Sequence, residues 1–140
     1  MPPKSSAKPR SPKLTEAQLE KQCSDLLELD GWRSLKTDPV SRREWGKGFG
    51  EKGMADRLYI RYDADVPPPI NRGLRSRADV MWIEWKTTTG RAEAHQVAWH
   101  TAERARGALV LLAGVDFPAT FDGFATWYRN SGLMRRAGLC

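Results

Sequence analysis

The chain has 140 residues, of which 40% are hydrophobic and 29% charged, with a formal net charge of +6. This length predicts one domain that buries a core without disulfides or structural metals, and two cysteines predict reduced thiols in a cytoplasmic protein. No apolar run approaches the roughly 20 residues of a membrane span, and the basic N-terminus lacks the apolar segment of a secretory signal.

The N-terminus differs in composition from the rest of the chain. Residues 1–13, MPPKSSAKPRSPK, contain four basic residues and no acidic residue. Their proline and serine content predicts a disordered basic tail, which either tethers the protein to polyanions or is simply solvated. Residues 14–140 are then expected to form the single folded domain.

The first helix is predicted over residues 15–30, where apolar residues follow the helical period. Thr15 and Gln18 have the spacing of a capping box at its start. Gly31 marks its end. The apolar stripe of this helix carries Leu19, Cys23, Leu26 and Leu27.

Three strands are expected next. A short strand over residues 32–37 is followed by a glycine-rich, basic loop over residues 38–56. Alternating residues predict a strand over residues 57–63, and a long proline- and arginine-rich connection leads to a third strand over residues 80–88.

The last third of the chain predicts helix, strand and helix. The helix over residues 91–106 ends before Gly107, and the continuous apolar run 108–114 is typical of a central buried strand. The expected core stripe of the helix over 91–106 consists of Ala94, Val97, Ala98, Thr101, Ala102 and Ala105. The final helix begins near Asp116 and Pro118, with aromatic residues at three- and four-residue spacing. The order predicts an α/β fold, a mixed central sheet flanked by helices in the arrangement αβββαβ plus a C-terminal helix.

Two charges interrupt the most apolar strand, VMWIEWKTTTG, residues 80–90. Because side chains alternate along a strand, Glu84 and Lys86 share one face, opposite the residues that anchor the strand in the core. Burying an unpaired charge is costly. The two residues therefore form either a salt bridge on an exposed edge or part of a site.

Asp56 is the candidate partner of Glu84. It follows a glycine-rich loop and precedes the strand that begins at residue 57. If that strand pairs antiparallel with the strand of Glu84, Asp56 reaches the same cleft, whereas Asp79 faces the other side. Two carboxylates with nearby carbonyl oxygens suit Mg²⁺, with Mn²⁺ as a substitute, and Lys86 can steady a pentacovalent phosphate.

The order of Asp56, Glu84-x-Lys86 and Gln96 resembles the PD-(D/E)XK nuclease superfamily, and more narrowly the VRR-NUC (virus-type replication-repair nuclease) domain. The matching pieces are GMADRLYI, WIEWKTTTGRAEAHQVAWH and GALVLLAG, and the similarity covers nearly everything except the tail. The E-x-K part alone is weakly specific, whereas the ordered set with Gln96 is more so. Ala55 departs from the family pattern, which often has proline before the aspartate.

This resemblance implies a restriction-endonuclease-like core and a Mg²⁺-dependent endodeoxyribonuclease that hydrolyses phosphodiester bonds. It implies that Asp56 and Glu84 bind the divalent metal. Lys86 would be the catalytic lysine, and Gln96 would position water or DNA beside the metal.

The resemblance also implies that an acid on the first helix is a metal or water ligand. Glu20 is our choice, because it lies 11 residues before Gly31, a spacing similar to that of related junction resolvases. Glu16, one turn earlier on the same face, is the reserve.

Small stand-alone members of the family act on branched DNA such as four-way (Holliday) junctions, often as dimers. By this resemblance we expect a structure-selective homodimer in a phage or bacterial host cytoplasm. Two alternatives remain open: a non-catalytic nucleic-acid-binding module in which Glu84 and Lys86 form only a salt bridge, and a nuclease that cuts duplex or flap DNA.

The basic loop is the candidate DNA-binding segment. Its Arg42, Arg43, Lys47 and Lys52 are expected to meet the phosphate backbone, although a merely solvated loop has the same composition. The glycines of this loop precede a strand and do not open a helix, so no nucleotide cofactor is expected.

Overall fold

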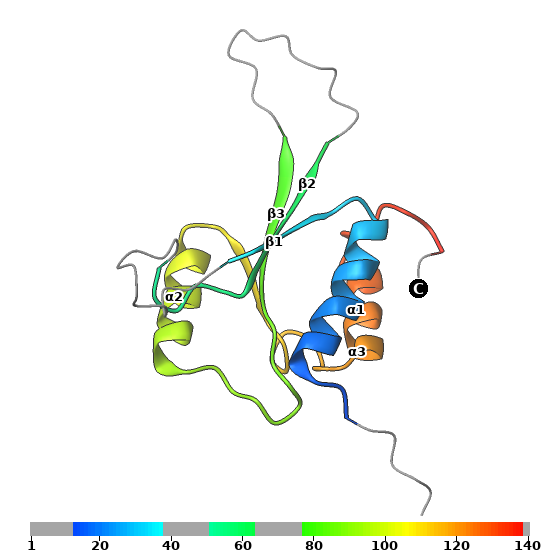
Figure 1. Cartoon of the computed structure of the whole chain (residues 1–140). Helices are drawn as coiled ribbons and strands as arrows, with labels where there is room; N and C mark the ends of the chain where they lie inside the picture. The colour runs from blue at the N-terminus through cyan, green and yellow to red at the C-terminus, as the bar shows by residue number, and fades with distance from the viewer. Residues whose placement is uncertain (1–12, 38–50, 64–76, 139–140) are drawn as a thin grey trace, which may run out of the picture.

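The computed structural model of the chain describes residues 13–37, 51–63 and 77–138 (Figure 1). It confirms the α/β class, with three helices and a four-stranded mixed sheet in the order α1, β1, β2, β3, α2, β4, α3. The expected disordered tail, apart from Lys13, lies outside the described residues. Within the described ranges no helix is long and apolar enough to cross a membrane.

The sheet has the strand order β1–β2–β3–β4. The strands are β1 (Arg33–Lys36), β2 (Arg57–Tyr62), β3 (Ala78–Glu84) and β4 (Leu109–Leu112), and the helices are α1 (Glu16–Leu29), α2 (Ala94–Ala105) and α3 (Phe121–Asn130). The first three strands pair antiparallel, as expected for β2 and β3, and β4 pairs parallel with β3 after the crossover through α2.

The helix ends follow from local capping. At the start of α1 the Thr15 side chain accepts a hydrogen bond from the Gln18 amide (3.2 Å) and the Gln18 side chain accepts one from the Thr15 amide (2.9 Å), which confirms the capping box. The last helix starts later than expected, because Thr120 provides the N-cap and its side chain accepts from the Gly123 amide (3.0 Å).

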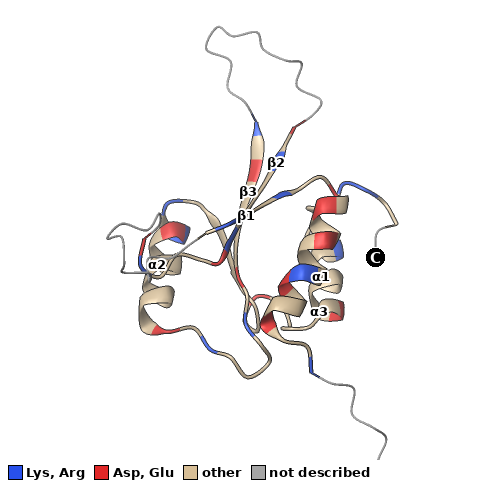
Figure 2. Cartoon of the chain, viewed as in Figure 1, with Lys and Arg blue, Asp and Glu red and all other residues tan. Residues whose placement is uncertain are grey.

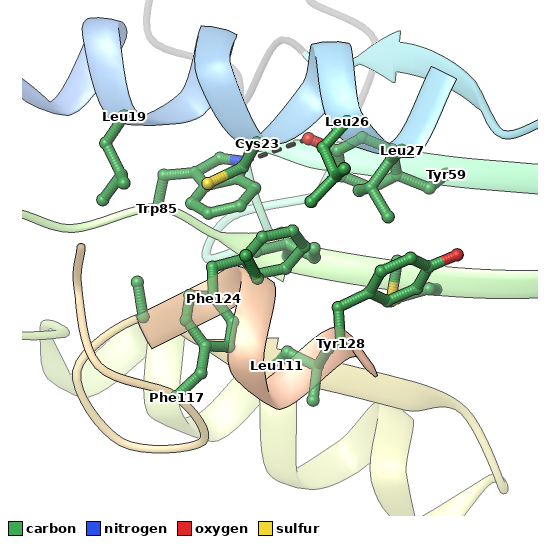
Figure 3. Packing of buried hydrophobic residues seen from close by; sticks show 14 of the residues in the cluster. Leu19, Cys23, Leu26, Leu27, Tyr59, Trp85, Leu111, Phe117, Phe124 and Tyr128 are labelled. Carbon is green, nitrogen blue, oxygen red and sulfur yellow. Dashed lines mark hydrogen bonds between the residues drawn. The ribbon is translucent and has the colours of Figure 1, made fainter. Parts of the chain in front are cut away.

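Helices cover both faces of the sheet (Figure 1). One face packs against α1 and α3 and forms the main core, in which Trp85 Nε1 donates to the Tyr59 hydroxyl (3.1 Å; Figure 3). The stripe of α1 is buried as expected. The other face packs against α2 through a smaller cluster, where the rings of Trp82 and Trp99 meet edge to face with centroids 5.1 Å apart.

The position expected for the strand in residues 108–114 is wrong. β4 lies at the edge of the described sheet. Its apolar run has another cause, since Val110 packs into the α2 cluster while Leu111 packs into the main core. Burial on both faces, rather than a central place in the sheet, explains the sequence pattern.

The prediction of which face of α2 is buried is also wrong. Its six members, Ala94, Val97, Ala98, Thr101, Ala102 and Ala105, are all exposed. The helix instead buries Trp99 and His100. Alanines contribute little apolar area, so the large indole decides which face turns inward.

Arg61 and Asp30 form a buried ion pair that extends to Asp79, which is partly exposed. Arg61, which is 3% exposed, donates to Asp30 (2.9 Å) and to Asp79 (2.9 Å), and its guanidinium lies 4.4 Å from the ring centroid of Trp32. Asp30 also accepts hydrogen bonds from the Tyr128 hydroxyl and from the amides of the C-terminal segment. Burial by itself would raise the pKa of Asp30, but these hydrogen bonds and the Arg61 charge lower it overall.

Candidate active site

Asp56 and Glu84 hold one another through the backbone. The Asp56 amide donates to Glu84 Oε2 (3.1 Å), and the Trp85 amide donates to Asp56 Oδ2 (3.0 Å). The antiparallel register of β2 and β3 opposes Arg57 to Ile83, so each carboxylate lies beside the backbone of the other strand. The expected meeting of Asp56 and Glu84 therefore occurs, at the point where both strands leave the ladder.

Lys86 and Gln96 converge on the same oxygen of Glu84. Lys86 Nζ lies 3.1 Å from Oε1, and Gln96 Nε2 donates to Oε1 at 2.6 Å. Gln96 Oε1 accepts from the Glu93 amide at the start of α2 (2.9 Å), so the amide group is held at both ends. The third strand ends at Glu84, earlier than expected, and Lys86 lies in the segment that follows.

Burial sets the ionisation of this cluster. It raises the pKa of Asp56 to about 6, helped by the charges of Glu16 and Glu20 and opposed by the Trp85 amide. Burial and the Asp56 charge raise the pKa of Glu84 to about 7, against the opposing effect of Lys86. Burial would lower the pKa of Lys86, but its hydrogen bond to Glu84 and the nearby acids raise it overall. Two carboxylates that resist ionisation next to a permanent ammonium group are a typical functional arrangement.

Glu20 is not drawn into this cluster. It forms an ion pair with Arg57, which also donates to the Ser34 hydroxyl (3.3 Å). This contact was not anticipated, although strand alternation places Arg57 on the same face as Tyr59, toward α1. The charge of the reserve residue, Glu16, acts more strongly on the Asp56 pKa than that of Glu20.

A groove of about 360 Å³ opens between α1 and β1 beside the Glu20–Arg57 pair. It is lined by charged and hydroxyl side chains of both elements, including Ser24 and Lys36, and neither Asp56 nor Glu84 reaches it. The groove is thus a neighbour of the carboxylate cluster and not the cluster itself.

Asp56 and Glu84 are the two carboxylates of this cluster that could hold a divalent ion. Glu84 Oε2 accepts a hydrogen bond from the Asp56 amide and Asp56 Oδ2 accepts one from the Trp85 amide. Because a carboxylate offers about four acceptor positions, both groups keep the capacity to bind a metal ion. Across residues 13–37, 51–63 and 77–138, however, no group of three or more His, Cys, Asp or Glu side chains could hold a metal. Mg²⁺ tolerates this, because it keeps several waters and often uses only one or two carboxylates.

No family model, curated protein or solved structure matches the chain. The chemistry of the cluster therefore follows from its own geometry. Asp56 and Glu84 offer oxygen ligands, and the Lys86 ammonium offers positive charge within reach of the same point. The Gln96 amide fixes the orientation of Glu84.

Of the expected DNA-binding residues, Arg42, Arg43 and Lys47 lie outside the described residues. Lys52 is described and exposed. Elsewhere in the described chain, basic and acidic residues are interspersed on the helices and on the β2–β3 hairpin (Figure 2). The strands β1 and β2 each carry two basic residues and no acidic residue, whereas α1 is mainly acidic.

The loop that carries Lys52 is fixed against α2. Glu51 accepts a hydrogen bond from Trp99 Nε1 (2.9 Å). Gly53 has a φ of +86°, and a Cβ at this position would collide with the backbone carbonyl of His95. This close approach fixes the segment that leads to Asp56. The sequence showed this segment only as a glycine-rich stretch and did not indicate the contact with α2.

Gly53→Ala is expected to lower the free energy of unfolding by roughly 2–4 kcal/mol, through left-handed strain plus the clash with α2. The control is Gly107→Ala, which has a φ of +95° but open space around the added methyl group; it should cost only about 1 kcal/mol. Urea unfolding measures both. Equal losses would show that close packing against α2 does not contribute.

Proposed function

We propose that the chain is a Mg²⁺-dependent endodeoxyribonuclease of the PD-(D/E)XK type, similar to VRR-NUC domains, that cuts branched DNA such as four-way junctions. One observation carries this proposal: Asp56, just before β2, and Glu84, at the end of β3, hold each other in place through backbone amides, while Lys86 and Gln96 bind the same oxygen of Glu84. The element order and the strand pairing support a restriction-endonuclease-like core.

Each side chain has a defined task in this proposal. Asp56 and Glu84 would hold Mg²⁺, with Glu16 or Glu20 orienting its water ligands. The bound ion would supply a lowered pKa for attacking water and charge against the phosphate. Lys86 stabilises the negative charge that develops on the phosphate oxygens. Gln96, tied to the Glu93 amide, keeps Glu84 from rotating out of the site.

The substrate class rests on the resemblance and on symmetry. A four-way junction presents two equivalent strands, so a homodimer would place one site on each. The test incubates end-labelled four-way junction, flap and linear duplex DNA with the protein and Mg²⁺ or Mn²⁺. Paired symmetric nicks in the junction support the proposal. Cleavage of flap or duplex DNA alone would retain the chemistry and change the substrate.

The binding-module alternative has its own supporting observation. Lys86 Nζ and Glu84 Oε1 form a salt bridge at 3.1 Å, which is the contact that this alternative requires. Titration calorimetry distinguishes the two functions. Mg²⁺ or Mn²⁺ binding by the wild type that is lost in Asp56→Asn and in Glu84→Gln supports the nuclease. DNA binding without such metal binding belongs to the module.

The raised pKa values make a prediction about stability. Asp56 and Glu84 bind protons more tightly in the folded than in the unfolded state, so their contribution is complete at acidic pH. It is lost as pH rises through about 6 and about 7. For Glu84 the loss is roughly 3 kcal/mol. His100, whose pKa is lowered, contributes with the opposite sign.

Thermal unfolding between pH 5 and 8 measures this effect, with Glu84→Gln isolating the contribution of Glu84. The variant should lose less stability than the wild type as pH rises. Mg²⁺ should stabilise the wild type most at pH 8, where both carboxylates are ionised. Glu28→Gln, an exposed acid of α1, serves as the control and should follow the wild type.

A further inference from the structure

His100 is a buried polar side chain that the proposed chemistry does not use. It lies on α2 one turn after Gln96, so both residues share a face of the helix. It is 2% exposed, and its Nε2 has no hydrogen-bond partner among the described residues. Buried nitrogens are nearly always hydrogen bonded, so this atom marks a place where a polar partner belongs.

Charged groups from three elements act on His100. They are Arg104 of α2, Asp116 of the segment after β4 and Lys86 of the segment after β3. Burial and the two cations lower the pKa of the ring, while Asp116 opposes them. The ring is therefore neutral at neutral pH and carries one N–H donor and one lone pair. A lone pair is the favourable group to present toward a cation.

The Lys86 ammonium group needs hydrogen-bond acceptors. It has three N–H donors, and its contact in the described site is Glu84 Oε1 at 3.1 Å. No direct hydrogen bond joins Lys86 to His100. Lys86 and Gln96, the residue one turn before His100, both bind Glu84 Oε1 (3.1 and 2.6 Å), so the Lys86 ammonium group lies beside the face of α2 that carries His100. A water molecule can connect two polar groups that are beyond direct hydrogen-bond reach.

We propose that His100 is a positioning residue for Lys86. Its Nε2 accepts a hydrogen bond from a water molecule, and that water accepts one from the Lys86 ammonium group. One N–H of Lys86 then holds Glu84, a second is fixed toward α2 and the third remains for the phosphate. The geometry stands without the nuclease function, but the catalytic consequence rests on that proposed function.

The first test uses the protein without DNA. Histidine labelled with ¹⁵N reports by nuclear magnetic resonance whether Nε2 carries a proton when the ring is neutral. An unprotonated Nε2 whose chemical shift changes in Lys86→Met, and not in the control Lys52→Met, supports the proposal. A protonated Nε2, or a shift unaffected by Lys86→Met, overturns it, whether or not the chain cuts DNA.

The second test measures cleavage by His100→Leu and His100→Gln, with circular dichroism to verify folding. His100→Leu should lower kcat roughly tenfold, the factor for one ordinary hydrogen bond, with KM within about twofold. His100→Gln places a polar group at similar reach and should recover most of kcat. An equal loss of kcat in both variants, or a change confined to KM, contradicts a positioning role.

Discussion

Under the proposed nuclease function, Lys86→Met is expected to lower the rate of metal-dependent DNA cleavage by roughly 10³-fold, because the negative charge that develops on the phosphate loses the Lys86 ammonium group. Glu84→Gln should lose at least as much, since it removes the negative charge that binds the metal and replaces one of the two acceptor oxygens by an NH2 group. Single-turnover cleavage of the junction substrate measures both rates. Neither change should prevent folding, because the main core lies behind these side chains.

The control is Lys21→Met. Lys21 is an exposed lysine of α1 that pairs with Asp25 at 2.9 Å, away from the carboxylate cluster. It should retain the wild-type rate within about twofold. If Lys86→Met also retains that rate, the lysine is part of a salt bridge only, and the binding-module alternative is favoured.

Asp30→Ala is expected to lower the free energy of unfolding by roughly 3–5 kcal/mol, the usual loss when one partner of a buried ion pair is removed. Arg61 would keep Asp79 as its carboxylate partner in the network, and the Tyr128 hydroxyl and the amides of Arg135 and Arg136 would lose the Asp30 acceptor. Urea unfolding at neutral pH measures the loss. Because the pKa of Asp30 is lowered, its stabilisation is complete above the ordinary range and disappears as pH falls.

The same helix supplies a matched control. Asp25→Ala removes an aspartate whose ion pair with Lys21 is exposed on both sides. It should cost less than about 1 kcal/mol. A loss of that size in Asp30→Ala as well would mean that Arg61 finds other partners, and that the network around it does not hold the C-terminal segment.

Much of the fold could be predicted from the sequence, because periodicity and capping are local signals. The capping box of α1 and the antiparallel pairing of β2 with β3 belong to this class. The inward face of α2 could not, since its alanines have the right spacing but little area to bury. A count of apolar positions missed Trp99 and His100, which decide the packing. The apolar run of β4 reflects burial of both faces of the strand. An edge strand and a central strand can both be buried in this way, so the run did not distinguish them.

The meeting of Asp56, Glu84 and Lys86 could be predicted from the sequence, whereas the place of Glu20 could not. Alternation placed Glu84 and Lys86 on one face, and the antiparallel pairing brought Asp56 beside them. The exchange of amide hydrogen bonds depends on the register to a single residue, which sequence pattern does not specify. The contact of Arg57 with Glu20 depends on how α1 crosses the sheet, so the choice between Glu20 and Glu16 required three-dimensional information.

The exchange of hydrogen bonds between Asp56 and Glu84 also determines how the strand ends behave over time. These ends lie beyond the regular ladder, where backbone amides open most readily. Here the carboxylates close them, so the Asp56 and Trp85 amides should exchange slowly with deuterated solvent. A ligand that draws Asp56 toward itself would release the Trp85 amide. The backbone at Trp85 would then fray each time a ligand binds, and its hydrogen bond to Asp56 would form again when the ligand leaves.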